Sequence, residues 1–237
     1  MGCQAPDYPA FLKSVLRLTN IRGALITMPH KVTTVDLLDE VTATVRVAGA
    51  CNAVKRLEDG RLVGDMFDGA GFVRGVQRKG LDLRDKRVLV VGSGGVGSAI
   101  AASLAGAGIA SITLYDVNTE AADALAARIK ANYPQIEVRT GSNDPVGCDL
   151  VVNATPMGMK AGDPLPLDVS RLAPGTFVGE VVMASEVTAF LAAARERGCC
   201  TQLGSDMLFE QIPAYLEYFG LPGTTAEQLR SLARLSY

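Results

Sequence analysis

A glycine-rich segment between a predicted strand and a predicted helix constrains the fold of this 237-residue chain more than any other feature. The segment reads KRVLVVGSGGVGSAIAASL and joins an apolar run to an alanine-rich run. Its G-x-G-x-x-G spacing lets a backbone turn tightly, approach a pyrophosphate and pack a helix onto a strand. We therefore expect a Rossmann-type fold that binds a nicotinamide dinucleotide at the helix N-terminus. The loop residues expected to hold it are Gly92, Gly94, Gly95, Val96 and Gly97.

From Lys86 onward, apolar runs of strand length alternate with helical segments. This alternation is typical of an α/β fold, in which helices cover both faces of a doubly wound parallel sheet. We expect this Rossmann domain to span residues 81–204. Its predicted strands are at residues 87–91, 111–116, 136–140, 149–155 and 176–182, and its predicted helices are at 96–106 and 119–132.

The remainder of the chain predicts a smaller α/β substrate domain. Its expected helices are at residues 8–18 and 32–39, and its expected strands are at 23–27, 51–57 and 61–64, with a hairpin turn between the last two. Two further helices, at 206–219 and 225–235, are expected to pack back on this unit. The substrate domain is then discontinuous and comprises residues 1–80 and 205–237.

The composition excludes several classes of protein. With 20% charged residues and a formal net charge of −2, the chain has no basic stripe that would neutralise a nucleic-acid backbone. No apolar run reaches the ~18 residues of a membrane span, and no signal peptide is recognisable, so we expect a cytoplasmic protein. The five cysteines form no C-x-x-C pair that could act with the single histidine, so no metal site is expected. Our hypothesis for the quaternary structure is a homodimer.

Asp116, at the end of the second strand of the predicted Rossmann domain, indicates the cofactor. An acid at this point accepts hydrogen bonds from both adenosine ribose hydroxyls and repels a 2′-phosphate, which favours NAD over NADP. A solvated turn or helix-cap aspartate is the alternative interpretation. Asn153, Thr155 and Met157 follow the fourth strand, at the carboxyl edge where the nicotinamide end should lie. Gly204 completes the expected cofactor-binding set.

Ordered motifs over nearly the whole chain resemble the shikimate/quinate dehydrogenase family: GALITMPHK, GACNAV, GRLVGDMFDGAGF, GSGGVGSA, NATPMGM and GSDMLFEQ. The resemblance implies reversible hydride transfer between a nicotinamide and a ring hydroxyl of shikimate, quinate or a related hydroxy acid. It also implies that Lys31 and Asp68 handle the hydroxyl proton, which alcohol oxidation independently requires. Asn52 and Gln211 match substrate-binding positions, and Thr27 is a further candidate for polar contact with the substrate.

The chain departs from the family pattern at several positions. The usual Asn-Thr before the catalytic aspartate is Met66-Phe67, the tyrosine after the fifth strand is Met183, and the arginine that reads a 2′-phosphate is Val117. The chain also begins after the strand and serine motif that hold the substrate carboxylate. We therefore expect either that the start of the chain is truncated or that the protein is a divergent paralogue without these carboxylate-binding residues.

Two alternatives remain open at this point. The first is a catalytically lapsed NAD-binding protein that serves as a sensor or assembly partner, and it is motivated by the missing serine motif together with Met66, Phe67 and Met183. The retention of Lys31 and Asp68 disfavours it. The second is a tetrahydrofolate-type dehydrogenase, which shares the two-domain plan but is disfavoured by the GACNAV and DMFDG motifs.

Overall fold

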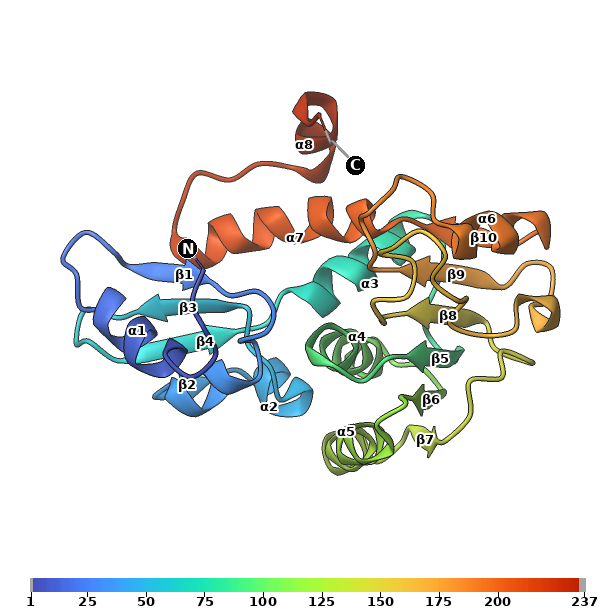
Figure 1. The fold of residues 1–237 in the computed structure, drawn as a ribbon, viewed down its shortest axis with the longest axis horizontal. Coiled ribbons are helices and arrows are strands. Elements are labelled where there is room, and N and C mark those ends of the chain that lie inside the picture. The colour runs from blue at the N-terminus through green and yellow to red at the C-terminus, as the bar shows by residue number, and fades with distance from the viewer. Residues whose placement is uncertain (1, 235–237) are drawn as a thin grey trace.

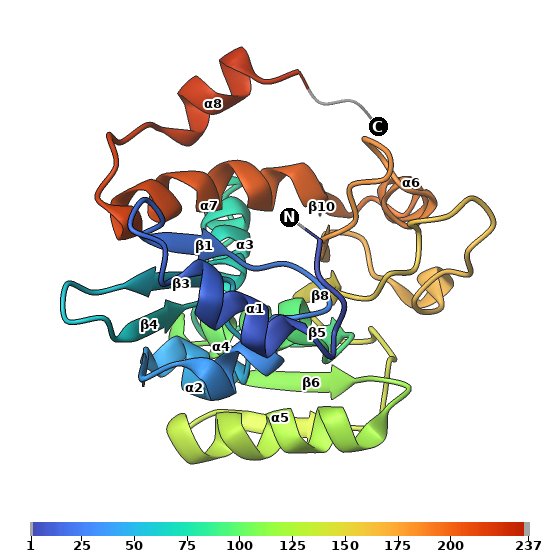
Figure 2. The same ribbon diagram turned by 60° about the vertical axis from the view of Figure 1, so that its left-hand side comes forward.

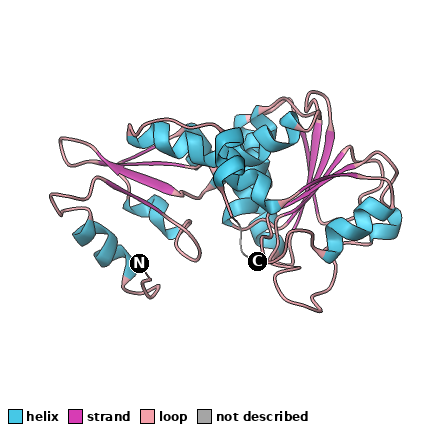
Figure 3. Cartoon of the chain, turned by 90° about the horizontal axis from the view of Figure 1, so that it is seen from above, coloured by secondary structure: helices cyan, strands magenta, loops and turns pink. Residues whose placement is uncertain are grey.

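The computed structural model describes residues 2–234, which form two sheets with helices packed between them (Figure 1; Figure 3). The first sheet has four strands in the order β1-β3-β4-β2, and the second has six in the order β10-β9-β8-β5-β6-β7. The bounds of the first sheet are β1 (Gly23–Leu25), β2 (Glu40–Val41), β3 (Ala53–Arg56) and β4 (Leu62–Asp65). Those of the second are β5 (Arg87–Val91), β6 (Ser111–Tyr115), β7 (Glu137–Thr140), β8 (Leu150–Asn153), β9 (Phe177–Glu180) and β10 (Cys200–Gln202).

The six-stranded sheet confirms the predicted α/β fold, because all its neighbouring strands pair in parallel. The strand order reverses direction between β5 and β8, and open α/β sheets bind ligands beyond the carboxyl ends of strands at such a point. All five predicted strands are present. The sixth strand, β10, was not predicted, because it is only three residues long and carries no apolar run.

Helices cover both faces of this sheet. α4 (Gly95–Gly106) and α5 (Thr119–Asn132) match the predicted helices, whereas α6 (Ala189–Glu196) was not predicted. The four apolar side chains of β5 alternate between two separate cores, one on each face of the sheet. A strand that is buried on both faces reads as a continuous apolar run, which is why β5 is recognisable in the sequence.

The four-stranded sheet confirms the hairpin between β3 and β4. The α-helix predicted at residues 32–39 is instead a short 3-10 helix, η1 (Thr33–Leu37). It ends because Leu38 adopts an extended backbone that leads towards β2. α1 (Tyr8–Val15) is as predicted but shorter. The unpredicted α2 (Ala43–Ala48) is capped by the Thr42 side chain and ends at Gly49, whose φ is +64°.

Two helices lie between the two sheets. These are α3 (Asp68–Arg78) and α7 (Gly204–Phe219), and α7 runs along β1 in the turned view, with α8 (Ala226–Leu232) on its outer side (Figure 2). The end of α7 returns to the first sheet as expected, because the Tyr218 hydroxyl donates to the Val63 carbonyl at 2.8 Å. α8 instead packs on α7, where Arg230 contacts Glu210. Residue 235, the predicted end of the last helix, lies outside the described residues.

The two sheets are also joined by direct contacts between helices. Arg128 of α5 donates to the carbonyls of Val47 and Ala48 at 2.8 and 3.2 Å, which satisfies two acceptors at the end of α2. α3 and α4 pack so closely that a β-carbon added at Gly69 would lie 2.0 Å from the Ala99 carbonyl oxygen. Within residues 2–234, no helix is both long and apolar enough to cross a membrane.

Candidate active site

Lys31 and Asp68 form an ion pair at the side of the first sheet that faces α4. Lys31 follows β1 in a loop, Asp68 is the first residue of α3, and Lys31 Nζ lies 2.5 Å from Asp68 Oδ2. The two side chains are only 12% and 4% exposed. The structure therefore brings together the two residues predicted to handle the substrate proton, in a place that water enters little.

Backbone hydrogen bonds position the Lys31 loop. The Ile26 N–H donates to the Asn52 carbonyl at 2.8 Å, and the Cys51 N–H donates to the Lys31 carbonyl at 2.9 Å. These bonds continue the pairing of β1 with β3 beyond the end of the strands. Lys31 and Asn52 are consequently held next to each other although 20 residues lie between them in the sequence.

Asn52 binds the aspartate of the pair directly. Its side chain is 1% exposed, and Nδ2 donates to Asp68 Oδ1 at 2.7 Å. Its Oδ1 accepts from the Phe67 N–H at 3.0 Å, which fixes the orientation of the amide. Lys31 and Asn52 thus approach the two oxygens of Asp68 separately, and the three side chains form one rigid hydrogen-bonded group.

The two other predicted substrate residues differ in their surroundings. Gln211 lies on α7 against α3, is 7% exposed, and its Oε1 has no hydrogen-bond partner within the described residues. A buried acceptor without a partner costs free energy unless a ligand or water satisfies it, which suits a binding residue. Thr27 is exposed, and its carbonyl accepts from the His30 N–H at 3.0 Å.

The glycine loop has the local geometry that its spacing predicts. Gly92 has a φ of +103°, and a β-carbon added at Gly97 would lie 1.9 Å from the Gly92 carbonyl oxygen, so the loop turns tightly and α4 packs against it. A β-carbon at Gly94 would meet nothing within 4 Å. At Gly95 it would lie 3.5 Å from Cβ of Lys31, which places the loop against the ion pair.

Asp116 is bonded to the glycine loop. Oδ2 accepts from the Ser93 N–H at 2.6 Å, and Oδ1 accepts from the Asn118 N–H at 2.8 Å. Each carboxylate oxygen can accept more than one hydrogen bond, so both remain able to accept from ribose hydroxyls. The neighbouring Val117 is 86% exposed and adds no positive charge.

The turn after β8 is internally bonded. Asn153 is fully buried, its Oδ1 accepts from the Thr155 hydroxyl at 2.6 Å, and its Nδ2 donates to the Met157 carbonyl at 3.1 Å. Gly92 packs against this turn, because a β-carbon there would lie 2.7 Å from the Ala154 carbonyl carbon. The expected nicotinamide-side residues therefore form a rigid turn beside the glycine loop.

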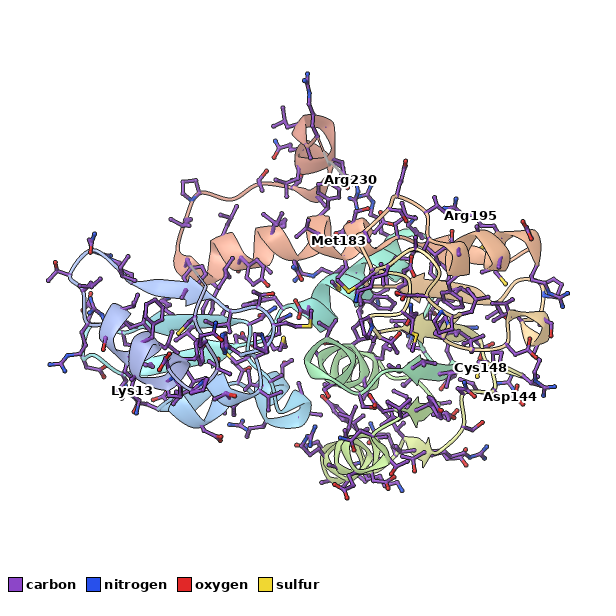
Figure 4. The ribbon with its side chains drawn as sticks, in the orientation of Figure 1. Lys13, Asp144, Cys148, Met183, Arg195 and Arg230 are labelled. Carbon is purple, nitrogen blue, oxygen red and sulfur yellow. The ribbon has the colours of Figure 1, made fainter. Side chains whose placement is uncertain are left out.

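Gly204 begins α7 beside the loop that follows β9. A β-carbon on it would lie 2.2 Å from the Val182 carbonyl oxygen, so this glycine permits a close backbone approach. Met183 follows on the same loop, is 45% exposed, and lies near the start of α7 (Figure 4).

One residue of this group was missed by the sequence analysis. The Tyr215 hydroxyl on α7 lies 2.7 Å from Asn52 Nδ2. Its spacing of four residues from Gln211 puts both on the same face of a helix, and this signal was available in the sequence.

Two family models match the chain. The shikimate dehydrogenase substrate binding domain matches residues 3–54, and the ThiF family matches residues 72–124. A shikimate dehydrogenase (NADP(+)) of Rubrobacter xylanophilus is 34% identical over 92% of this chain and 78% of its own length. A quinate/shikimate dehydrogenase (NAD(+)) of Corynebacterium efficiens is 37% identical over 89% of this chain and 76% of its own.

The chain belongs to the shikimate/quinate dehydrogenase family. The solved quinate dehydrogenase of Corynebacterium glutamicum, in complex with NAD, superposes with a TM-score of 0.84 at 33% identity, covering 97% of this chain and 84% of its own. Membership makes the chain an NAD(P)-dependent oxidoreductase of CH–OH groups and sets aside the tetrahydrofolate-type family. The comparisons give no support to a catalytically lapsed protein.

This dehydrogenase carries a buried acid beside the turn after β8. Glu180 ends β9 in register with Asn153 and is 1% exposed. Its Oε1 accepts from the Thr188 hydroxyl at 2.7 Å, whereas Oε2 has no hydrogen-bond partner within residues 2–234. Burial raises the pKa of Glu180, and the Thr188 hydrogen bond offsets part of that effect.

Replacing Glu180 by glutamine is expected to stabilise the protein more at pH 8 than at pH 5. A carboxyl whose pKa is raised on folding loses stability as the pH rises from about 4.3, its unfolded value, through its folded pKa, because the unfolded chain releases the proton first. Glutamine removes this loss, and each kcal/mol recovered in this way corresponds to about 2–4 °C in Tm. Thermal unfolding at both pH values measures it. An equal shift at both would contradict the ionisation argument.

Proposed function

We propose that this chain catalyses reversible hydride transfer between NAD and a ring hydroxyl of shikimate, quinate or a related hydroxy acid. The observation that carries the proposal is the buried Lys31–Asp68 ion pair, held against Gly95 of the glycine loop. Lys31 and Asp68 are the proposed catalytic residues, and Asn52, Gln211 and Thr27 are the proposed substrate-binding residues. The proposed cofactor-binding residues are Gly92, Gly94, Gly95, Val96, Gly97, Asp116, Asn153, Thr155, Met157 and Gly204.

The described residues fit a dinucleotide. The open space at Gly94 is where a pyrophosphate would lie, at the N-terminus of α4, whose first N–H groups have no intrahelical partners and favour negative charge. Asp116 would accept from the ribose hydroxyls at the end of β6. The turn from Asn153 to Met157 would enclose the nicotinamide side. When bound, the oxidised nicotinamide supplies the hydride acceptor.

The ion pair would move the proton. Loss of hydride from an alcohol carbon becomes favourable as the hydroxyl gives up its proton to a base within hydrogen-bond reach. Lys31 Nζ would first release a proton to solvent through its 12% exposed side and then accept the hydroxyl proton, which restores the ammonium of the ion pair. Asp68 stabilises the ammonium that forms, and Asn52 holds Asp68 in place. In the reverse direction the Lys31 ammonium returns the proton to the substrate oxygen.

The proposed domain boundaries follow the two sheets. Residues 81–204 contain every strand of the six-stranded sheet, and residues 1–80 contain every strand of the four-stranded sheet. Residues 205–237 are assigned to the substrate domain, because the described end of α7 bonds to the first sheet. The homodimer and the cytoplasmic location stay predictions.

The proposed preference for NAD rests on the charge at the end of β6. Asp116 would repel a 2′-phosphate, and Val117 offers no cation to bind one. The double change Asp116→Asn and Val117→Arg is therefore expected to raise the NADP-to-NAD ratio of kcat/KM by about 10²–10³, equivalent to about 3–4 kcal/mol. Asparagine has one side-chain oxygen, which keeps the acceptor for the Ser93 N–H of the glycine loop, while the Asn118 N–H loses its acceptor.

Steady-state rates with each cofactor measure this ratio. Val117→Arg alone is the control, because it adds the cation but keeps the repelling carboxylate, and it should move the ratio much less. If the unaltered protein already prefers NADP, Asp116 does not select the cofactor.

The function is tested by following NADH formation at alkaline pH with shikimate and quinate, each supplied with NAD and with NADP. Turnover of either acid supports the proposal. If NAD binds but neither acid is turned over, the substrate is a different hydroxy compound and the proposed substrate class is wrong.

A further inference from the structure

Tyr215 places a hydroxyl group directly beside the proposed proton-handling pair. Its oxygen lies 2.7 Å from Asn52 Nδ2, and the same nitrogen lies 2.7 Å from Asp68 Oδ1. Tyr215 reaches this position from α7. The side-chain amide of Asn52 therefore bridges the Tyr215 hydroxyl and the Asp68 carboxylate, on which the proposed chemistry depends.

The bonding of Asn52 determines which way the Tyr215 hydrogen bond runs. The Phe67 N–H binds Asn52 Oδ1, so Nδ2 faces Asp68 and Tyr215 and gives one proton to each. The phenol oxygen is thus an acceptor in this bond, and its own proton remains to be donated. Within residues 2–234 the structure pairs that proton with no acceptor.

Tyr215 is a donor and not a base. Burial, and after it the charge of Asp68, raise the pKa of Tyr215 above its ordinary value, while the Asn52 hydrogen bond lowers it less. The phenol therefore keeps its proton throughout the working range. A neutral phenol with a free O–H binds an oxygen atom of a ligand.

The Tyr215 ring is held by a residue at which the chain departs from the family pattern. Phe67 replaces the usual threonine and packs edge-on against the Tyr215 ring, with centroids 5.2 Å apart at 69°. Tyr215 of α7 thus places a hydroxyl beside Phe67, a position at which the usual threonine hydroxyl is absent. Gln211 lies on the same face of α7, one turn earlier.

We propose that Tyr215 orients the substrate by donating its O–H to the ring hydroxyl next to the one that is oxidised, while Asn52 and Phe67 hold the phenol in place. Gln211 and Tyr215 then form the edge of the site that selects substrates with two adjacent hydroxyl groups. Besides its proposed contact with the substrate, Asn52 positions Asp68 and Tyr215. This inference rests on the proposed function, because it requires a ring hydroxyl at Lys31 and Asp68.

The test is Tyr215→Phe, assayed with NAD, shikimate and a shikimate analogue in which the hydroxyl next to the oxidised one is replaced by hydrogen. We expect KM for shikimate to rise by about 10-fold with kcat changed by less than about threefold, as for the loss of uniform binding. The analogue should be used equally well by the variant and the unaltered protein. A merely structural role for the hydroxyl would impair both substrates alike.

The matched control is Tyr218→Phe, which removes a phenol hydroxyl from the same helix. That hydroxyl donates to the Val63 carbonyl and has no contact with Asn52 or Asp68. The control should lower Tm without changing the ratio of kcat/KM for shikimate to that for the analogue. Tyr215→Phe should reduce this ratio by about 10-fold.

Three outcomes contradict the inference. If the unaltered protein turns over shikimate and Tyr215→Phe leaves the ratio unchanged, Tyr215 does not contact the adjacent hydroxyl, and the proposed function is unaffected. If the unaltered protein turns over neither shikimate nor quinate, the proposed function fails and this inference fails with it. A fall in kcat for both substrates would also overturn it, because Tyr215 would then act on the reacting group.

Discussion

Replacing Lys31 by methionine is expected to lower kcat by about 10²–10⁴ while NAD still binds. Methionine keeps the apolar stem that packs near Gly95 but removes the Nζ atom that lies 2.5 Å from Asp68. The variant loses the group that accepts the hydroxyl proton. NADH formation measures the rate, and cofactor titration measures binding, so loss of chemistry is separated from loss of the cofactor site.

The loss of Lys31 also leaves Asp68 buried without its counter-ion. Removing one partner of a buried ion pair destabilises a protein by about 3–5 kcal/mol, so a fall in Tm is expected as well. The double variant Lys31→Met and Asp68→Asn removes the stranded charge. It should recover much of the stability but none of the activity, which shows that the rate loss is not a consequence of unfolding.

Lys13→Met is the matched control for this substitution. Lys13 is an exposed lysine on α1, at the far end of the first sheet from α4 (Figure 4). Its replacement should change neither kcat nor Tm measurably. Retained turnover in Lys31→Met would remove the central claim of the mechanism.

Gly97→Ala and Gly94→Ala are expected to change different properties of the protein. The first should lower the free energy of unfolding, and the second should weaken cofactor binding. The Gly97 β-carbon would lie 1.9 Å from the Gly92 carbonyl oxygen, so the loop or α4 must move, at a cost of about 1–3 kcal/mol or more in unfolding free energy. The Gly94 β-carbon would meet no atom within 4 Å, and its φ of −70° suits any residue. Gly94→Ala should therefore leave Tm nearly unchanged.

Gly94→Ala, which should leave Tm nearly unchanged, is expected to weaken cofactor binding more than its effect on stability can explain. At Gly94 the methyl group would occupy the space assigned to the pyrophosphate, so Kd for NADH should rise by about 10–100-fold in a fully folded protein. Fluorescence titration with NADH and thermal unfolding give the two quantities for each variant. If Gly94→Ala binds NADH as tightly as the unaltered protein, the phosphates lie elsewhere.

Much of the Rossmann domain could be predicted from the sequence because its signals are local. β5 is an apolar run buried on both faces, and α4 and α5 show helical spacing over 12 and 14 residues. The glycine spacing of the loop predicts its backbone geometry directly, because the glycines mark a tight turn and close approaches of the backbone. β2 and β10, of two and three residues, contain no apolar run by which they could be recognised.

α3 shows why one important helix was missed. It contains Gly69, Gly71 and Gly75, and each glycine lowers helix propensity by about 1 kcal/mol relative to alanine. The packing explains their presence, since a β-carbon at each would lie within 2.0 to 2.7 Å of an atom of α4, α7 or Gln202. Tertiary contacts select glycine here, and they override the local preference that sequence analysis reads.

The sequence by itself determined that the chain contains a parallel α/β sheet with a dinucleotide loop, because strand periodicity and glycine spacing depend only on neighbouring residues. Only the tertiary structure decided that Lys31 and Asn52 meet Asp68, and that Tyr215, 163 residues after Asn52, completes the group. Those contacts depend on how α3 and α7 pack between the sheets. Packing of this kind is a property of the whole chain. Local patterns did not indicate it, and only the family resemblance grouped Lys31, Asp68 and Asn52 beforehand.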